Sequence, residues 1–379
     1  MADAEVIEPD AAFVRRLMEH GGDTLKKCFQ CGNCSVVCNV TPDGAPFPRK
    51  EMIWAQWGLS RRLLADADVW LCHQCNDCST HCPRGARPAD VLAAVRNISF
   101  TEYAAVPALA RLVASPRGMP LLTLIPIVWI GAVIAIASKA GFAAMEPIVF
   151  SNMMPVPAID SVFLPAVGFA VVMAALGAMK LWRALNAGAP VSGPVASAAA
   201  AAALDVLTHR RFAKCQTNAP RYTAHLLTMY GFIALMATTS LVALMYWINK
   251  LGIGEVASTP LALTHPVKIL GNFGALLAVT GVTLVIMRRY GAAKDAAGHS
   301  GYYDGHFIFV LFVTIASGIL SELLRLAGIA PLAFGMYFVH LVFVFTLLAY
   351  APFSKFAHLL YRFTAMTYAA AAKRDAARP

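Results

Sequence analysis

Hydrophobic and polar positions divide the chain into two parts. Up to about residue 110, apolar and charged residues alternate over short stretches, with helical periodicity over 48–64 and 88–100. Beyond it, six apolar stretches are long enough to cross about 30 Å of hydrocarbon. They lie at about 119–139, 162–182, 223–248, 267–287, 307–327 and 335–358. The pattern predicts a mainly α-helical protein, with an N-terminal domain followed by a six-helix transmembrane bundle.

Composition supports this division. Hydrophobic residues make up 58% of the 379 residues and charged residues 14%, against about 45–50% and 25% in soluble domains. A disordered chain is excluded, and a purely soluble one is disfavoured. We expect a cytoplasmic domain over 1–110, a transmembrane domain over 111–365 and a basic tail over 366–379. The alanine-rich run near residue 200 fits either a helix at the membrane surface or a solvated linker.

The net charge of +10 comes from basic residues that flank the apolar stretches, as in a multi-pass membrane protein rather than a nucleic-acid-binding one. Their distribution places both termini and the N-terminal domain on the cytoplasmic side of the cell inner membrane. The first ten residues, MADAEVIEPD, are acidic and have no apolar core, so no signal peptide is expected. Clustered cysteines in a reducing compartment indicate metal ligands rather than disulfides.

Eight of the nine cysteines form two runs with the spacing C-x2-C-x2-C-x3-C. Three thiolates at this spacing bind three corners of an iron–sulfur cubane, and in two-cluster ferredoxins the fourth ligand comes from the other run. One [4Fe–4S] cluster is therefore expected on Cys28, Cys31, Cys34 and Cys82. The second is expected on Cys72, Cys75, Cys78 and Cys38.

Zinc sites and disulfides are the alternatives, but paired C-x2-C zinc knuckles do not explain this spacing twice. The ninth cysteine, Cys215, has no partner in either motif and is interpreted as structural.

Histidines in the membrane region predict haem ligands, because ionisable residues inside a membrane mark functional sites by default. His340 and His358 are 18 residues apart on one predicted helix, which places them on one face about 27 Å apart. His225 is expected at the depth of His358 near the cytoplasmic side, and His265 at the depth of His340 near the outer side. We expect two b haems, one on His225 and His358 and one on His265 and His340.

His306 is the alternative ligand for the outer haem. No C-x-x-C-H motif for covalent haem attachment is present. Three residues near the outer helix ends are candidates for contact with a quinone head group: Lys268, Glu322 and Arg325. Each also fits a charged side chain that reaches the membrane interface.

Residues 28–100 resemble the small iron–sulfur subunit of heterodisulfide reductases, on the segments CFQCGNCSVVC, PRKEMIWAQWGL and WLCHQCNDCSTHCPRG. Residues 221–362 resemble the cytochrome b subunits of respiratory nitrate reductase and of membrane heterodisulfide reductase, on FVHLVFVFTLLAYAPFSKFAHLLYR. The fusion of both modules is similar to the C subunits of the quinone-interacting membrane-bound oxidoreductase complexes of sulfur-metabolising prokaryotes.

This resemblance implies a respiratory subunit that transfers electrons between menaquinol or another quinone and cytoplasmic flavin- and iron–sulfur-containing subunits. It also implies a connection to adenylylsulfate reductase in sulfate respiration. No nucleophile, carboxylate pair or glycine-rich nucleotide loop indicates chemistry on another substrate, so no catalytic residue is assigned. Two alternatives stay open: the membrane subunit of a heterodisulfide-reductase-type complex, and a non-redox, zinc-binding membrane scaffold.

Overall fold

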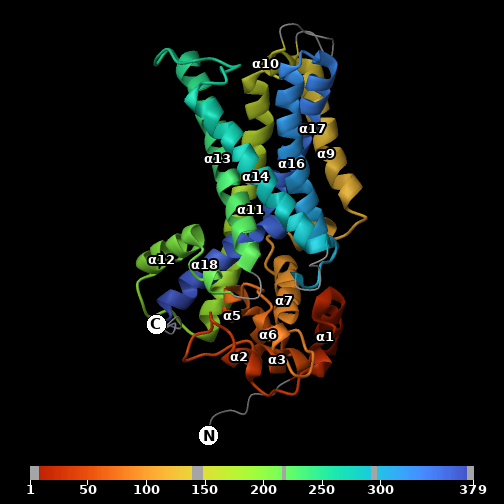
Figure 1. Ribbon diagram of the computed structural model, residues 1–379, viewed down its shortest axis with the longest axis vertical. Helices are drawn as coiled ribbons and strands as arrows, with labels where there is room; N and C mark the ends of the chain where they lie inside the picture. The colour runs from red at the N-terminus through yellow and green to blue at the C-terminus, as the bar shows by residue number, and fades with distance from the viewer. Residues whose placement is uncertain (1–7, 139–147, 216–218, 292–296, 374–379) are drawn as a thin grey trace.

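Helices are the regular elements of the structure, a computed structural model that describes residues 8–138, 148–215, 219–291 and 297–373. No β-strand occurs within these ranges. Short helices surround the cysteine loops at one end, and six long helices run away from them (Figure 1). The predicted mainly α-helical fold is confirmed.

The N-terminal part consists of short helices joined by loops. They are α1 (Ala11–Leu17), α2 (Asn33–Val36), α3 (Arg49–Gln56), α4 (Ser60–Leu64), α5 (Asp68–Leu71), α6 (Asp77–Thr80), α7 (Pro88–Glu102) and α8 (Pro107–Val113). The segment with helical periodicity, 48–64, forms two helices, α3 and α4, separated by a turn at Gly58, which has a left-handed φ of 66°. A Cβ there would lie 2.8 Å from the backbone nitrogen of Asp10, so the chain needs glycine at this close approach.

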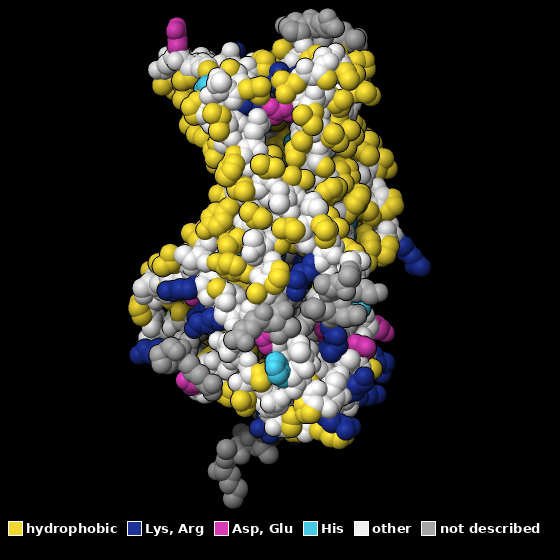
Figure 2. Space-filling view, viewed as in Figure 1, with side chains coloured by type: hydrophobic (Ala, Val, Ile, Leu, Met, Phe, Trp, Pro, Cys, Tyr) yellow, Lys and Arg dark blue, Asp and Glu magenta, His cyan; other side chains and the backbone are white. Residues whose placement is uncertain are grey.

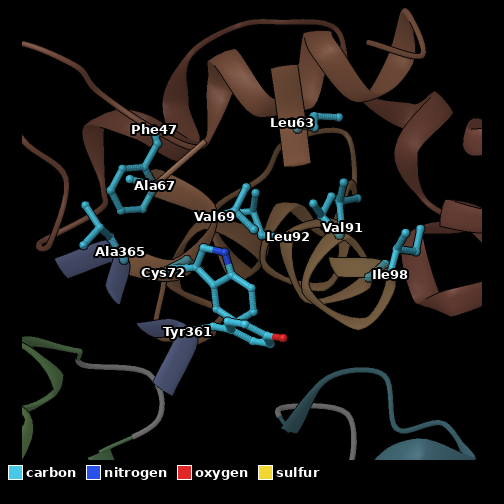
Figure 3. Packing of buried hydrophobic residues seen from close by; sticks show 14 of the residues in the cluster. Phe47, Leu63, Ala67, Val69, Cys72, Val91, Leu92, Ile98, Tyr361 and Ala365 are labelled. Carbon is cyan, nitrogen blue, oxygen red and sulfur yellow. The ribbon is translucent and has the colours of Figure 1, made fainter. Parts of the chain in front are cut away.

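One hydrophobic cluster joins this part to the C-terminal helix, α18 (His358–Ala371). The ring of Trp70 packs against Phe100 of α7, with centroids 5.5 Å apart, and against Tyr361 of α18, 5.4 Å away. Figure 3 shows Tyr361 and Ala365 of α18 among the buried residues of the cysteine domain. The two parts therefore share a core.

Within the described residues, six helices are long and apolar enough to cross a membrane. They are α9 (Met119–Ala137), α11 (Val156–Gly188), α13 (Ala219–Lys250), α14 (Pro266–Tyr290), α16 (Tyr302–Leu326) and α17 (Ala330–Ala349). Large apolar side chains cover their outer surface, whereas Lys and Arg side chains gather mainly around the N-terminal part (Figure 2). An exposed apolar surface of this extent indicates a membrane protein, and the predicted number of apolar helices is confirmed.

The last predicted span, 335–358, is wrong at its C-terminal end. α17 ends at Ala349, and Pro352 cannot continue it because proline has no backbone N–H to donate. Two 3-10 turns follow, Ala351–Phe353 and Lys355–Ala357. His340 and His358 therefore lie on different helices, and the predicted alignment on one helix face does not hold.

The alanine-rich run forms α12 (Val195–Thr208), which packs along α18 with Ala198 and Ala202 buried. The C-terminal end of α18 is hydrogen-bonded to the segment just before α12: Gly193 donates its backbone N–H to the carbonyl of Ala371 at 2.8 Å. A solvated linker is therefore excluded. α12 instead belongs to the layer of helices beside the cysteine domain (Figure 1).

Small residues allow α13 and α14 to pack at close range. A Cβ on Gly231 would lie 2.4 Å from the backbone nitrogen of Ala278, and one on Gly281 would lie 2.4 Å from that of Thr228. Close backbone approach through small residues is typical of helix pairs in membranes. This contact fixes α13, the helix that carries His225.

We expect Gly231→Ala to lower the melting temperature of the detergent-solubilised protein, because the methyl group has no room beside Ala278. Such overpacking costs about 1–3 kcal/mol. Gly168→Ala in α11 is the matched control, since a Cβ there meets nothing within 4 Å. Equal melting temperatures for the two variants would contradict the close packing of α13 on α14.

Candidate functional site

The two cysteine runs fold into the same backbone shape. Gln30 and Gln74, two residues after the first cysteine of each run, have left-handed φ angles of 61° and 53°. Gly32 and Asn76 are also left-handed, with φ angles of 86° and 69°. Glycine and asparagine are the residues that adopt this conformation most readily, so the sequence directs both runs to wind in the same way before a short helical turn, α2 or α6.

The first group of thiols surrounds one cavity. Its lining includes Cys28, Cys31, Cys34 and Cys82. Three of these belong to the first run and the fourth to the end of the second, so the fold brings together the four predicted ligands of one cluster. Burial raises the pKa of the Cys34 thiol to about 11.

The second group combines Cys38 with three cysteines of the second run. The Cys38 thiol interacts electrostatically with those of Cys72 and Cys75, and Cys78 interacts with all three. Burial raises the pKa of Cys38 to about 12. Two groups of four soft sulfur donors fit two iron–sulfur clusters, whose coordination displaces the thiol protons.

Cys215 lies beside the second group, although it belongs to neither cysteine motif. Its thiol shares a hydrogen bond with Cys75, which lowers the pKa of Cys75 and raises that of Cys215. No motif spacing could have placed it here, because 140 positions of sequence separate it from its partner.

Two arginines of the membrane part bind the loop that carries this second group. Arg221, in the first turn of α13, donates to the carbonyls of His73 and Gln74, each at 2.8 Å. Arg362 of α18 donates to the carbonyl of Cys72 and lies 2.6 Å from the His73 Nδ1. Burial and the neighbouring Arg362 lower the pKa of His73, so this imidazole is the neutral acceptor.

His225 and His358 lie on the same two helices as these arginines. His225 is four residues after Arg221 on α13, and His358 four residues before Arg362 on α18, so each lies one helical turn from its arginine. The ring centroids of the two histidines are 6.3 Å apart. Burial lowers the pKa of His358 to about 4, which keeps its imidazole neutral.

The spacing of this pair fits two nitrogen ligands of one metal ion. The Nδ1 of His358 lies 2.7 Å from the carbonyl of Lys355, and that of His225 lies 2.7 Å from His209. These contacts use the Nδ1 atom of each ring and not its Nε2 atom. Two imidazoles facing each other across one metal, with bonds of about 2 Å, have ring centres about 6 Å apart, close to the observed spacing.

His209 itself lies at the end of α12 and is buried. Burial lowers its pKa. The sequence offers only a histidine in a basic segment here, so its contact with His225 depends on the tertiary packing of α12.

The structure does not bring His265 and His340 together. The Nδ1 of His265 caps the first turn of α14, accepting from Val267. The next turn is level with the C-terminal end of α16, because Lys268 pairs with Glu322 at 2.6 Å. His340 instead lies 2.9 Å from the carbonyl of Thr314, about 12 Å deeper along α16 than Glu322.

The remaining candidates occupy the two ends of α16. His306 is buried in its first turns and its ring stacks on Tyr302, with centroids 5.7 Å apart. It lies at the opposite end of α16 from Glu322. Lys268 and Glu322 form the ion pair described above, Asn272 donates to Glu322 at 3.4 Å, and Arg325 lies in the last turn.

Comparison with known families yields two matches. The family model described as "Citrate utilization protein B" matches residues 103–379. The model described as "4Fe-4S dicluster domain" matches residues 24–86. No solved structure matches the chain.

Curated relatives are iron–sulfur subunits of heterodisulfide reductases or proteins like them. One, from Archaeoglobus profundus, is described as similar to the C subunit of heterodisulfide reductase; it is 34% identical over 105 residues, which cover 27% of this chain and 56% of that protein. Another is the C subunit of the H(2):CoB-CoM heterodisulfide,ferredoxin reductase of Methanothermobacter marburgensis, 35% identical over 91 residues, 23% and 48% of the two chains. The chain thus spans about half the length of the curated relatives it matches.

We expect Cys38→Ser to remove one iron–sulfur cluster, because Cys38 completes the second group of four thiols. Cys215→Ser is the matched control at the same site, and should keep both clusters while its contact with Cys75 weakens. Iron analysis and electron paramagnetic resonance of the reduced proteins measure the difference. Loss of a cluster in Cys215→Ser with retention in Cys38→Ser would reverse the assignment.

Proposed function

The chain belongs to the citrate utilization protein B family, and from this premise we propose that it is the membrane-bound electron-transfer subunit of a multi-subunit oxidoreductase. The dicluster domain match over 24–86 and the two groups of four cysteines support the electron-transfer role. The six apolar helices support the membrane location. The curated relatives are subunits of larger reductase complexes, which supports partner subunits.

We assign one [4Fe–4S] cluster to each cysteine group and one b haem to His225 and His358. When bound, these groups supply one-electron carriers, whose potentials depend on ligands, hydrogen bonds and burial. The chain's own residues hold them: thiolates and imidazoles as ligands, and Arg221 and Arg362 as the ties that keep the second cysteine loop beside the histidine pair.

One observation carries this proposal. Arg221 and Arg362 each bind the loop of Cys72 and each lie one turn from a histidine of the pair. Phe212 extends the contact, since its ring stacks on His73 with centroids 5.3 Å apart and lies 6.0 Å from that of His225. A protein that used the cysteines only to bind structural zinc would not need contacts that connect the cysteine loop to this pair of imidazoles.

On the membrane side we propose a quinone as the redox partner, because it is a carrier dissolved in the bilayer that membrane helices can reach. Lys268, Glu322 and Arg325 remain candidate contacts at the outer helix ends. His265 and His340 do not enter as a haem pair. In its more specific form, the proposal names menaquinone as the quinone and flavin-containing subunits and adenylylsulfate reductase as partners. This part of the proposal depends on the resemblance in sequence.

A second candidate function is favoured by the curated relatives, whose names refer to heterodisulfide reductases. The chain would then serve as the membrane subunit of a heterodisulfide-reductase-type complex, with the same cofactors and a partner that reduces a disulfide. The name of the family refers instead to citrate utilization, which points to a partner acting in the use of that acid. The cytoplasmic partner distinguishes these possibilities.

The proposed orientation places the cysteine domain and α18 in the cytoplasm. Lys and Arg side chains gather around this end in Figure 2, in agreement with the positive-inside rule. The partner subunits would then dock on the side where the first cysteine group lies.

We expect the purified protein to contain about eight non-haem irons, from two [4Fe–4S] clusters, and one b haem. His225→Leu and His358→Leu should each lose the haem spectrum while keeping the iron–sulfur iron, because each removes one imidazole of the pair. His265→Leu should retain the haem. Two haems in the wild type, one of them lost in His265→Leu, would instead restore the pairing of His265 with His340.

The redox partner is tested with the same protein. A menaquinol analogue added to the oxidised form is expected to reduce the haem in optical spectra. Haem reduction only by a co-purified cytoplasmic protein, with no response to quinol, would favour the heterodisulfide-reductase-type function. A colourless protein with zinc and no iron would overturn both.

A further inference from the structure

At the turn that follows α12, the imidazole of His209 contacts that of His225 on α13. The Nε2 of His209 lies 2.7 Å from the Nδ1 of His225, and the two ring centroids are 4.8 Å apart. His209 is 8% exposed. The contact occupies the Nδ1 of His225, so it leaves the Nε2 of that ring available to a metal.

The fold holds His209 in a backbone conformation that side chains rarely adopt. It ends α12 with a left-handed φ of 53°. Asp205 stabilises this turn by salt bridges to Arg210, at 2.7 Å, and to Arg211, at 3.0 Å. Tyr230 of α13 donates its hydroxyl to the carbonyl of Leu207 at 2.7 Å. Strained conformations persist where surrounding contacts determine them, and they cluster at functional sites.

The role of each nitrogen in this contact follows from His225 in the proposed function. An imidazole that binds iron through Nε2 keeps its proton on Nδ1, so His225 is the donor. The Nε2 of His209 is then the acceptor, and the ring proton of His209 lies on its Nδ1, a buried atom with no hydrogen-bond partner among the described residues.

We propose that His209 is a positioning residue for the haem: it accepts the Nδ1–H of His225, fixes the rotation of that ring and lowers the haem reduction potential. This inference rests on the proposed function, in which His225 is an axial ligand. Metal-bound histidines commonly donate their other N–H to an acceptor that orients the ring and makes it a stronger donor. A stronger donor stabilises oxidised iron more than reduced iron, hence the lower potential.

The test compares three variants in the full-length, haem-loaded protein. His209→Leu removes the acceptor and keeps an apolar side chain of similar volume, whereas His209→Gln retains an acceptor. His20→Leu is the control, because His20 is exposed and its Nδ1 bonds to the nearby Arg16 carbonyl, far from His225 in the sequence. Redox titration followed in the optical spectrum gives the potential, and electron paramagnetic resonance of the oxidised haem gives the ligand field.

His209→Leu is expected to keep the haem with about 10- to 100-fold weaker retention, a higher potential and an altered resonance signal. His209→Gln should lie nearer to wild type, and His20→Leu should match it. A haem in His209→Leu with wild-type potential and signal would overturn the role of His209 alone. Loss of the haem from His209→Leu but not from His225→Leu would make His209 the ligand, and absence of haem from the wild type would overturn both proposals.

Discussion

The hydrogen bonds of Arg221 and Arg362 to the second cysteine loop are the contacts on which the rest of the arrangement depends. Both side chains come from helices that begin or end at the membrane part, and both reach carbonyls between Cys72 and Gln74. A histidine lies one turn away on each helix. The same two helices therefore set the position of the cysteine loop and of the imidazole pair.

This junction concentrates positive charge, and burial together with the neighbouring Arg96 lowers the pKa of Arg362 to about 9. Arg96 adds a third guanidinium, which donates to the carbonyl of Val69 at 2.7 Å. Removing charge from water is costly unless hydrogen bonds and opposite charges compensate for it. Here the carbonyls compensate for the arginines, and thiolate ligands of a cluster on Cys72 and Cys75 would add negative charge beside them. In the sequence these arginines appear only as part of the excess of basic residues around the apolar stretches. In the structure they lie beside the second cysteine group.

The sequence predicted what depends on local spacing. The cysteine intervals predicted two groups of four, and apolar length predicted six spans, since both signals lie within a few neighbouring residues. Contacts between distant segments were not predictable in this way: Cys215 beside Cys75, and His209 beside His225, follow from how α12 packs on α18. The pairing of His265 with His340 does not hold because α17 begins at Ala330 and not near residue 335, so His340 lies about three turns into its helix, whereas His265 directly precedes α14.

The central claim is that electrons pass within one chain between the cysteine clusters and the histidine pair. Rapid photoreduction of the clusters in the purified protein, followed by optical detection of the b haem, tests this claim directly. The account predicts haem reduction at a rate that does not change when the protein is diluted, because the Arg221 and Arg362 contacts hold both sites together. A rate proportional to protein concentration, or reduced clusters beside a haem that stays oxidised despite a higher potential, would contradict it.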